Sequence, residues 1–270
     1  TASRRRTLLP ENSQYASLGV PIIARWYYAW FETGCLSAHF RTMVVEGEEV
    51  RAFVEPSSAD DGLVRIGADK TDGGEVLRGT ASVGGAGETE LERRLAGLRP
   101  ADNLVILEHL SVGQKGAVPE MVRMDLDQHM GDLYPFSLAE KLAVITENSP
   151  WYSGPSPWGG AIIPLEMVTV LAQYTSHSAG MQGKGPAIGL FADLEIRMLK
   201  GPLMVGRDYL IKREIVALSE SRRTESYWVR SQITDPDTGD VLAATLLNHA
   251  VLKASYADYA DEYTRLTAGT

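Results

Sequence analysis

Apolar positions form two kinds of run along this chain, wide runs that suit a buried helix and short alternating runs that suit strands. Residues 20–33 are apolar or aromatic on most sides, which predicts a helix buried nearly all round that ends at Gly34. Residues 161–177 carry a second run of the same kind. We therefore expect two long buried helices.

Strand-like segments follow each helical run. After the first run come 43–45, 50–54, 63–68 and 76–83, separated by turn residues. After the second come 187–199, 209–218, 226–234 and 241–252. Between the two sets, the charged stretch 88–99 predicts a linker and 120–126 predicts a strand. Ser137 and Glu140 form a capping box, which predicts a short helix that runs into Glu147.

The chain contains an ordered duplication. Glu11-Asn12-Ser13-Gln14-Tyr15 returns as Glu147-Asn148-Ser149-Pro150-Trp151-Tyr152, and glycine followed by an apolar run comes after both. This unit is too long for a solenoid repeat, so we expect two fused halves, 1–87 and 111–270, joined by a linker over 88–110. The first half lacks the opening strand and short helix of the second, so it is a degenerate copy or takes these elements from elsewhere.

Composition and charge narrow the class of protein. The 270 residues are 44% hydrophobic and 23% charged with a net charge of −9, and no basic cluster is interleaved with aromatics, which argues against a nucleic-acid partner. Three arginines at 4–6 precede an apolar stretch too short for a signal peptide. We expect a soluble, unexported protein with no membrane partner.

Cysteine and histidine usage limits the redox and metal chemistry. Cys35 is the only cysteine, which excludes internal disulfides and fits a reducing cytoplasm, and we expect it to be a small buried residue at the end of the first helix. The five histidines lack metal-ligand spacing, so neither a metal nor another cofactor is expected.

The segment from Thr146 to Met167 resembles the MaoC-like, (R)-specific enoyl-CoA hydratases and dehydratases. In that family a G-D-x-N-P-x-H motif is followed by a glycine-rich segment that leads into the central helix. This segment ends in a proline. Here Glu147 takes the place of the aspartate and Tyr152 that of the histidine, while Trp158-Gly159-Gly160-Ala161-Ile162-Ile163-Pro164 matches the helix start. The resemblance implies an α+β double hotdog fold, in which two tandem units each wrap an antiparallel sheet around a long helix.

The resemblance also implies a substrate and a set of roles. The substrate would be an acyl thioester carried by CoA or, less readily, by a carrier protein. Glu147 would supply a carboxylate base and Tyr152 an acid, since a phenol with a pKa near 10 donates a proton more readily than it accepts one. Oxyanion and substrate contacts would come from Gly159, Gly160, Trp151, Trp158 and Pro164, and a weak set of CoA phosphate contacts from Arg197, Arg207 and Lys212.

Other interpretations fit the same residues. Glu147 is equally suited to ending a helix, and Tyr152 to packing in the core. We expect Glu166 to interact with the dipole of the second helix rather than to point into a cavity. A hotdog thioesterase would use the same glycines, and a non-catalytic acyl-thioester-binding or scaffold subunit that needs a partner would explain the loss of the aspartate and histidine. Because hotdog proteins pair through sheet edges, we expect a homodimer.

Overall fold

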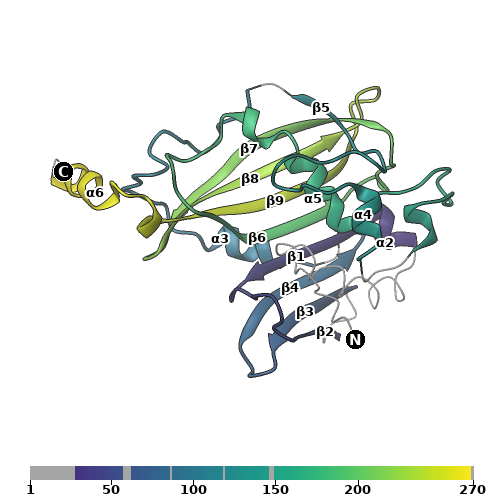
Figure 1. The fold of residues 1–270 in the computed structure, drawn as a ribbon, viewed down its shortest axis with the longest axis horizontal. Coiled ribbons are helices and arrows are strands. Elements are labelled where there is room, and N and C mark those ends of the chain that lie inside the picture. The colour runs from purple at the N-terminus through teal and green to yellow at the C-terminus, as the bar shows by residue number, and fades with distance from the viewer. Residues whose placement is uncertain (1–27, 57–61, 86, 118, 146–148, 269–270) are drawn as a thin grey trace.

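The computed structural model describes residues 28–56, 62–85, 87–117, 119–145 and 149–268. Within these ranges the strands form a single antiparallel sheet in the order β2-β3-β4-β1-β6-β9-β8-β7-β5 (Figure 1). The strands are β1 (Gly34–Phe40), β2 (Val50–Pro56), β3 (Leu63–Lys70), β4 (Glu75–Val83), β5 (Glu120–Arg123), β6 (Gly189–Met198), β7 (Asp208–Glu220), β8 (Thr224–Thr234) and β9 (Val241–Leu252). The helices are α2 (Tyr28–Thr33), α3 (Glu90–Ala96), α4 (Leu138–Leu142), α5 (Leu165–Gln173) and α6 (Tyr259–Ala268), and the short 3₁₀ turns are η1 (Pro150–Tyr152), η2 (Ser176–Ala179) and η3 (Lys253–Ser255).

The sheet is continuous because β1 pairs with β6. This seam joins a strand from each predicted half of the chain, with the pairing running from Cys35 opposite Arg197 to His39 opposite Asp193. On one side of the seam lie β4, β3 and β2, and on the other lie β9, β8, β7 and β5. Residues 154 positions apart in sequence therefore become direct neighbours.

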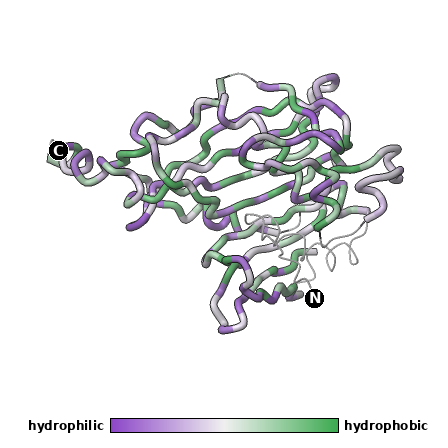
Figure 2. The backbone as a smooth tube through the Cα atoms, viewed as in Figure 1, coloured by the Kyte–Doolittle hydropathy of each residue, from purple (hydrophilic) through white to green (hydrophobic). Residues whose placement is uncertain are grey.

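Helices cover both faces of the sheet. All nine residues of α5 are buried, and the helix belongs to the main apolar core together with Leu194 and Ile196 of β6. Helix α3 contacts the alternate residues of the same strand, since its Arg94 reaches Asp193. Successive strand residues point to opposite faces, so α5 and α3 lie on opposite sides of β6. Figure 2 shows hydrophobic residues recurring along the strands of the sheet.

The strand pattern is confirmed for β2–β9, but it missed β1. Segment 34–40 mixes glycine, cysteine, serine and alanine and lacks a clear apolar alternation, although Leu36 and Ala38 are fully buried. The prediction of a strand at 43–45 is wrong, because those residues follow β1 as a loop in which Met43 and Val45 are 67% and 57% exposed. Cys35 is buried as expected, but it lies in β1 rather than at a helix end.

Helix α5 is shorter than the apolar run that predicted it. Helix α5 begins at Leu165 because Pro164 precedes it in an extended conformation, and it ends at Gln173. Helix α2 covers 28–33 and ends directly before Gly34, as predicted, whereas residues 20–27 and the first copy of the duplicated segment lie outside the described residues. The capping box of Ser137 and Glu140 is present, but α4 ends at Leu142 and does not run on toward 147.

The segment predicted as a linker is packed against the sheet. It contains α3, which starts with a capping box between Thr89 and Glu92. The loop that follows is held by the fully buried carboxylate of Glu225, which accepts backbone N–H groups at 2.9, 2.9 and 3.0 Å from Val105, Ile106 and Leu107. This stretch therefore has fixed structure, and the domain boundaries at 87 and 110 stay a prediction.

Candidate functional site

The start of α5 is built from a glycine turn and two backbone hydrogen bonds. Gly159 has φ +108°, a region that favours glycine. The N–H of Ile162 donates to the carbonyl of Trp151 at 2.9 Å, and that of Ile163 to Leu203 at 2.8 Å. No side chain caps the helix at Pro164. The segment that leads into the buried helix α5 therefore has two consecutive glycines, at positions 159 and 160.

Only one of the two predicted catalytic residues lies in the described part of the chain. Tyr152 ends η1, is 1% exposed and belongs to the main apolar core. Its ring meets Phe31 of α2 edge-on, with 6.3 Å between the ring centroids. Glu147 lies outside the described residues. The pairing of these two side chains across a pocket stays a prediction.

Trp151 and Trp158 pack against each other and against α2. Their rings are perpendicular with centroids 5.6 Å apart, Phe31 lies 5.5 and 5.7 Å from them, and Tyr28 stacks on Trp151 at 5.6 Å. Trp158 Nε1 also donates to Glu32 Oε1 at 3.0 Å. The tryptophans therefore fasten the start of α5 to the N-terminal half, and their contact with an acyl group stays a prediction.

A buried ion pair joins α4 to α5. Lys141 Nζ lies 2.7 Å from Glu166 Oε1, and the two side chains are 5% and 3% exposed. Neither carboxylate oxygen has a well-directed hydrogen bond from any residue in the described ranges. Burial raises the pKa of Glu166, and the ammonium of Lys141 opposes that rise. Glu166 thus faces helix α4. The sequence did not identify Lys141 as its ion-pair partner, because single charged residues in apolar runs are common.

The basic residues suggested for CoA phosphates are either paired with carboxylates or exposed. Arg197 Nη2 lies 2.7 Å from Glu92 and 3.1 Å from Glu195. Arg207 pairs with Asp235, and Lys212 is exposed on β7. Phosphate binding by these three side chains would require Arg197 and Arg207 to exchange existing partners, so that assignment stays a prediction.

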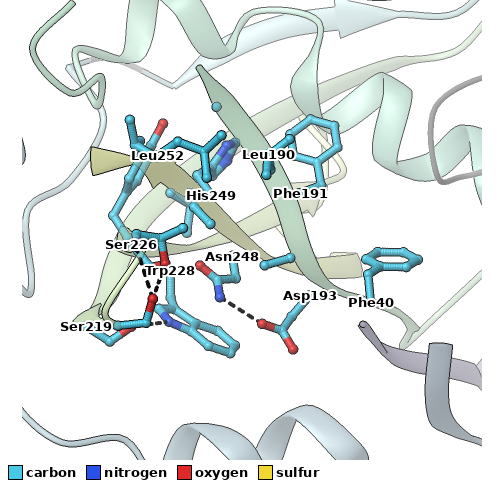
Figure 3. A pocket seen from close by; sticks show the side chains of 18 of the residues that line it. Phe40, Leu190, Phe191, Asp193, Ser219, Ser226, Trp228, Asn248, His249 and Leu252 are labelled. Carbon is cyan, nitrogen blue, oxygen red and sulfur yellow. Dashed lines mark hydrogen bonds between the residues drawn. The ribbon is translucent and has the colours of Figure 1, made fainter. Parts of the chain in front are cut away.

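A cavity of about 1500 Å³ opens around the ends of β6, β8 and β9 (Figure 3). On one side of the sheet, the ring of His249 stacks on Tyr227 with centroids 4.7 Å apart and meets Phe191 edge-on at 5.5 Å. On the other side lie Asp193 and Asn248, which are joined by a hydrogen bond. No sequence motif predicted this cavity, because its walls come from segments far apart in the chain.

Stability should fall between pH 7 and pH 5 through His249. Burial lowers its pKa from 6.5 to about 4, so folding favours the neutral ring, and this contribution is lost as the pH falls from 6.5 toward 4. A full shift would remove roughly 2 kcal/mol of stability at pH 5, and because the residue is partly exposed we expect a loss of about 1 kcal/mol. Urea unfolding at the two pH values, compared with His249→Phe, measures it; an unchanged pH slope in the variant contradicts the assignment.

Metal and membrane features are absent from the described part of the chain. No group of three or more histidine, cysteine, aspartate and glutamate side chains there is placed to hold a metal ion. None of the helices in the same ranges is long and apolar enough to cross a bilayer. The thiol of Cys35 is free and buried, and burial together with nearby Glu195 raises its pKa. A buried neutral thiol of this kind is a poor nucleophile.

Comparison with known proteins supports the fold. No protein-family model and no curated protein matches the chain. Among solved structures, it is similar to a MaoC domain protein from Chloroflexus aurantiacus J-10-fl, with TM-score 0.50 and 16% identity over 87% of this chain and 81% of that one. It is also similar to a conserved hypothetical protein from Mycobacterium tuberculosis with a double hotdog fold, with TM-score 0.50 and 13% identity over 90% and 82%. The predicted likeness to MaoC-like double hotdog proteins is confirmed at the level of the fold.

Proposed function

We propose that this chain is a lyase of the hydratase or dehydratase type that acts on an acyl thioester, with CoA as the expected carrier. The observation that carries the proposal is the start of α5, where Gly159 and Gly160 precede a buried helix that no side chain caps at Pro164. Backbone N–H groups at such a helix start stabilise negative charge, which develops on the thioester oxygen when the α-carbon loses a proton. The absent side chains at 159 and 160 leave room for that approach.

The proposed chemistry assigns a base and an acid. In the dehydration direction, the Glu147 carboxylate takes the α-proton, the β-hydroxyl leaves with a proton from Tyr152, and water and an enoyl thioester are formed. A phenol is a weak base at neutral pH, so this pair suits elimination better than the hydration that a histidine would support. The single buried cysteine suits a reaction in the reducing cytoplasm.

The product of turnover tests the reaction class. The purified chain is given 3-hydroxyacyl-CoA and enoyl-CoA substrates of short, long and aromatic type. We expect a change in enoyl absorbance without release of free thiol. Release of thiol without any absorbance change would instead establish hydrolysis and overturn the lyase assignment in favour of a thioesterase.

A binding subunit is the second candidate, because Tyr152 is 1% exposed and both tryptophans are engaged with α2. A chain of this kind would bind acyl-CoA but would turn over only with a partner subunit that supplies an aspartate and a histidine. Calorimetric binding of a non-hydrolysable acyl-CoA, without turnover by the purified chain, would favour this candidate over the lyase.

A homodimer is expected because β2 and β5 are the edge strands of the sheet that the described residues form, and sheet edges are commonly closed by a second chain. Size-exclusion chromatography with light scattering should give about twice the 29.4 kDa of one chain. A monomer mass across micromolar concentrations would contradict it.

A further inference from the structure

A polar cluster at the seam between β1 and β6 takes no part in the proposed reaction. Asp193 of β6 is fully buried, and its carboxylate accepts hydrogen bonds from His39 Nδ1 at 2.8 Å, Arg94 Nε at 2.7 Å and Asn248 Nδ2 at 2.7 Å. The three donors come from β1, α3 and β9. Asp193 therefore holds three neighbouring side chains in fixed orientations.

In the described part of the chain, one buried acceptor of this cluster has no hydrogen-bond partner, and a second ring nitrogen is not engaged with Asp193. A carboxylate only accepts, so His39 donates through Nδ1, and in the tautomer that carries its proton there Nε2 is an acceptor. The amide nitrogen of Asn248 faces Asp193, and its Oδ1 has no hydrogen-bond partner among the described residues although the residue is only 5% exposed. Both residues line the cavity, and Figure 3 shows Asn248 beside Asp193. A buried acceptor such as Asn248 Oδ1 is normally satisfied, so an additional donor is missing at this place.

Charge and shape indicate what that donor belongs to. The positive charge of Arg94 neutralises the negative charge of Asp193 in an ion pair. His39 Nε2 and Asn248 Oδ1 therefore lie beside an ion pair without net charge. Trp228 and Leu98 line the same side of the cavity and pack in one apolar cluster. A neutral donor beside an apolar body satisfies both features, whereas a carboxylate would bring acceptors to acceptors and an ammonium would lose its hydration.

We propose that this seam is a second ligand site, in which His39 Nε2 and Asn248 Oδ1 receive a hydroxyl or amide N–H of a neutral small molecule whose apolar part lies against Trp228 and Leu98. The site lies on the α3 face of the sheet, opposite α5, and it stands or falls independently of the acyl-thioester reaction. It needs no metal and no covalent step.

Four probes of matched size separate the chemistry: benzyl alcohol, benzamide, benzylamine and benzoate. In the full chain labelled with ¹⁵N-histidine, we expect benzyl alcohol and benzamide to shift the His39 Nε2 resonance upfield in a saturable way. Benzylamine and benzoate should leave it unchanged at the same concentrations. No shift with any probe, or an equal shift with all four, overturns the proposal.

One variant removes a named atom, and a second variant is its control. Asn248→Leu removes the open acceptor and should weaken benzyl alcohol binding by at least about tenfold, as expected for a lost buried hydrogen bond. His129→Gln alters an exposed histidine elsewhere and should bind like the unmodified chain. If Asn248→Leu does not fold, the probe-dependent shift of His39 in the unmodified chain decides alone. Unchanged binding in a folded Asn248→Leu variant refutes the site.

Discussion

Replacing Lys141 by methionine is expected to lower the free energy of unfolding by about 3 kcal/mol at pH 7. The substitution keeps the length of the side chain but leaves Glu166 buried without its ammonium partner, 2.7 Å away in the native protein. A buried carboxylate can escape that penalty only by taking a proton. From the ordinary value of 4.5, this costs about 1.4 kcal/mol for each pH unit, or about 3 kcal/mol at pH 7.

The same reasoning fixes the sign of the pH dependence. The folded variant favours the protonated acid, so its pKa lies above the unfolded value and stability is regained as the pH falls toward 4.5. The difference between Lys141→Met and the unmodified chain should shrink to about 1–2 kcal/mol at pH 5.5. Urea unfolding at the two pH values measures both differences.

A matched double variant isolates the ion pair. Lys141→Met with Glu166→Leu removes both charges and should recover most of the lost stability, because an apolar pair of similar volume replaces a desolvated ion pair without large loss. Lys212→Met, at an exposed position, should change stability by less than about 0.5 kcal/mol. A loss below about 1 kcal/mol for Lys141→Met alone would mean that water reaches Glu166.

The fold was accessible from sequence wherever local pattern and tertiary contacts agree. Strands β7, β8 and β9 are long and bounded by turn residues, and the capping box of Ser137 lies within one short segment. Strand β1 was not predicted because its small residues form a strand through pairing with β4 and β6. This tertiary effect leaves no local sequence pattern. The second long helix was predicted too long, because an apolar run does not show that the helix starts only after Pro164.

The site divides in the same way. The glycines and Pro164 at the start of α5 are contiguous in sequence, so a motif reveals them. The contact between His39 and Asp193 spans 154 positions, and that between Lys141 and Glu166 joins two helices. Such pairs are created by the sheet seam and by helix packing, and a single sequence contains no local trace of either. The aromatic contacts of Trp158 with α2 belong to the same class.

Replacing Glu147 by glutamine is expected to lower kcat by about 10²–10⁴-fold if the proposed lyase reaction is right. Glutamine keeps the size and hydrogen-bonding capacity of the side chain but cannot accept the α-proton. Substrate binding depends on other contacts, so KM should change little. Tyr152→Phe should lower dehydration by a comparable factor because the leaving hydroxyl loses its proton donor. Steady-state absorbance measurements on the purified chain give both constants.

The exposed carboxylate of Glu214 on β7 supplies the control, and Glu214→Gln should keep full turnover. An unfolding midpoint equal to that of the unmodified chain is required of the Glu147 variant, so that lost turnover is not lost fold. If Glu147→Gln turns over normally while Tyr152→Phe is mainly destabilised, position 147 only ends a segment and Tyr152 only packs against Phe31. That result removes the base and acid together, and it leaves the binding subunit as the function that the buried aromatic cluster fits.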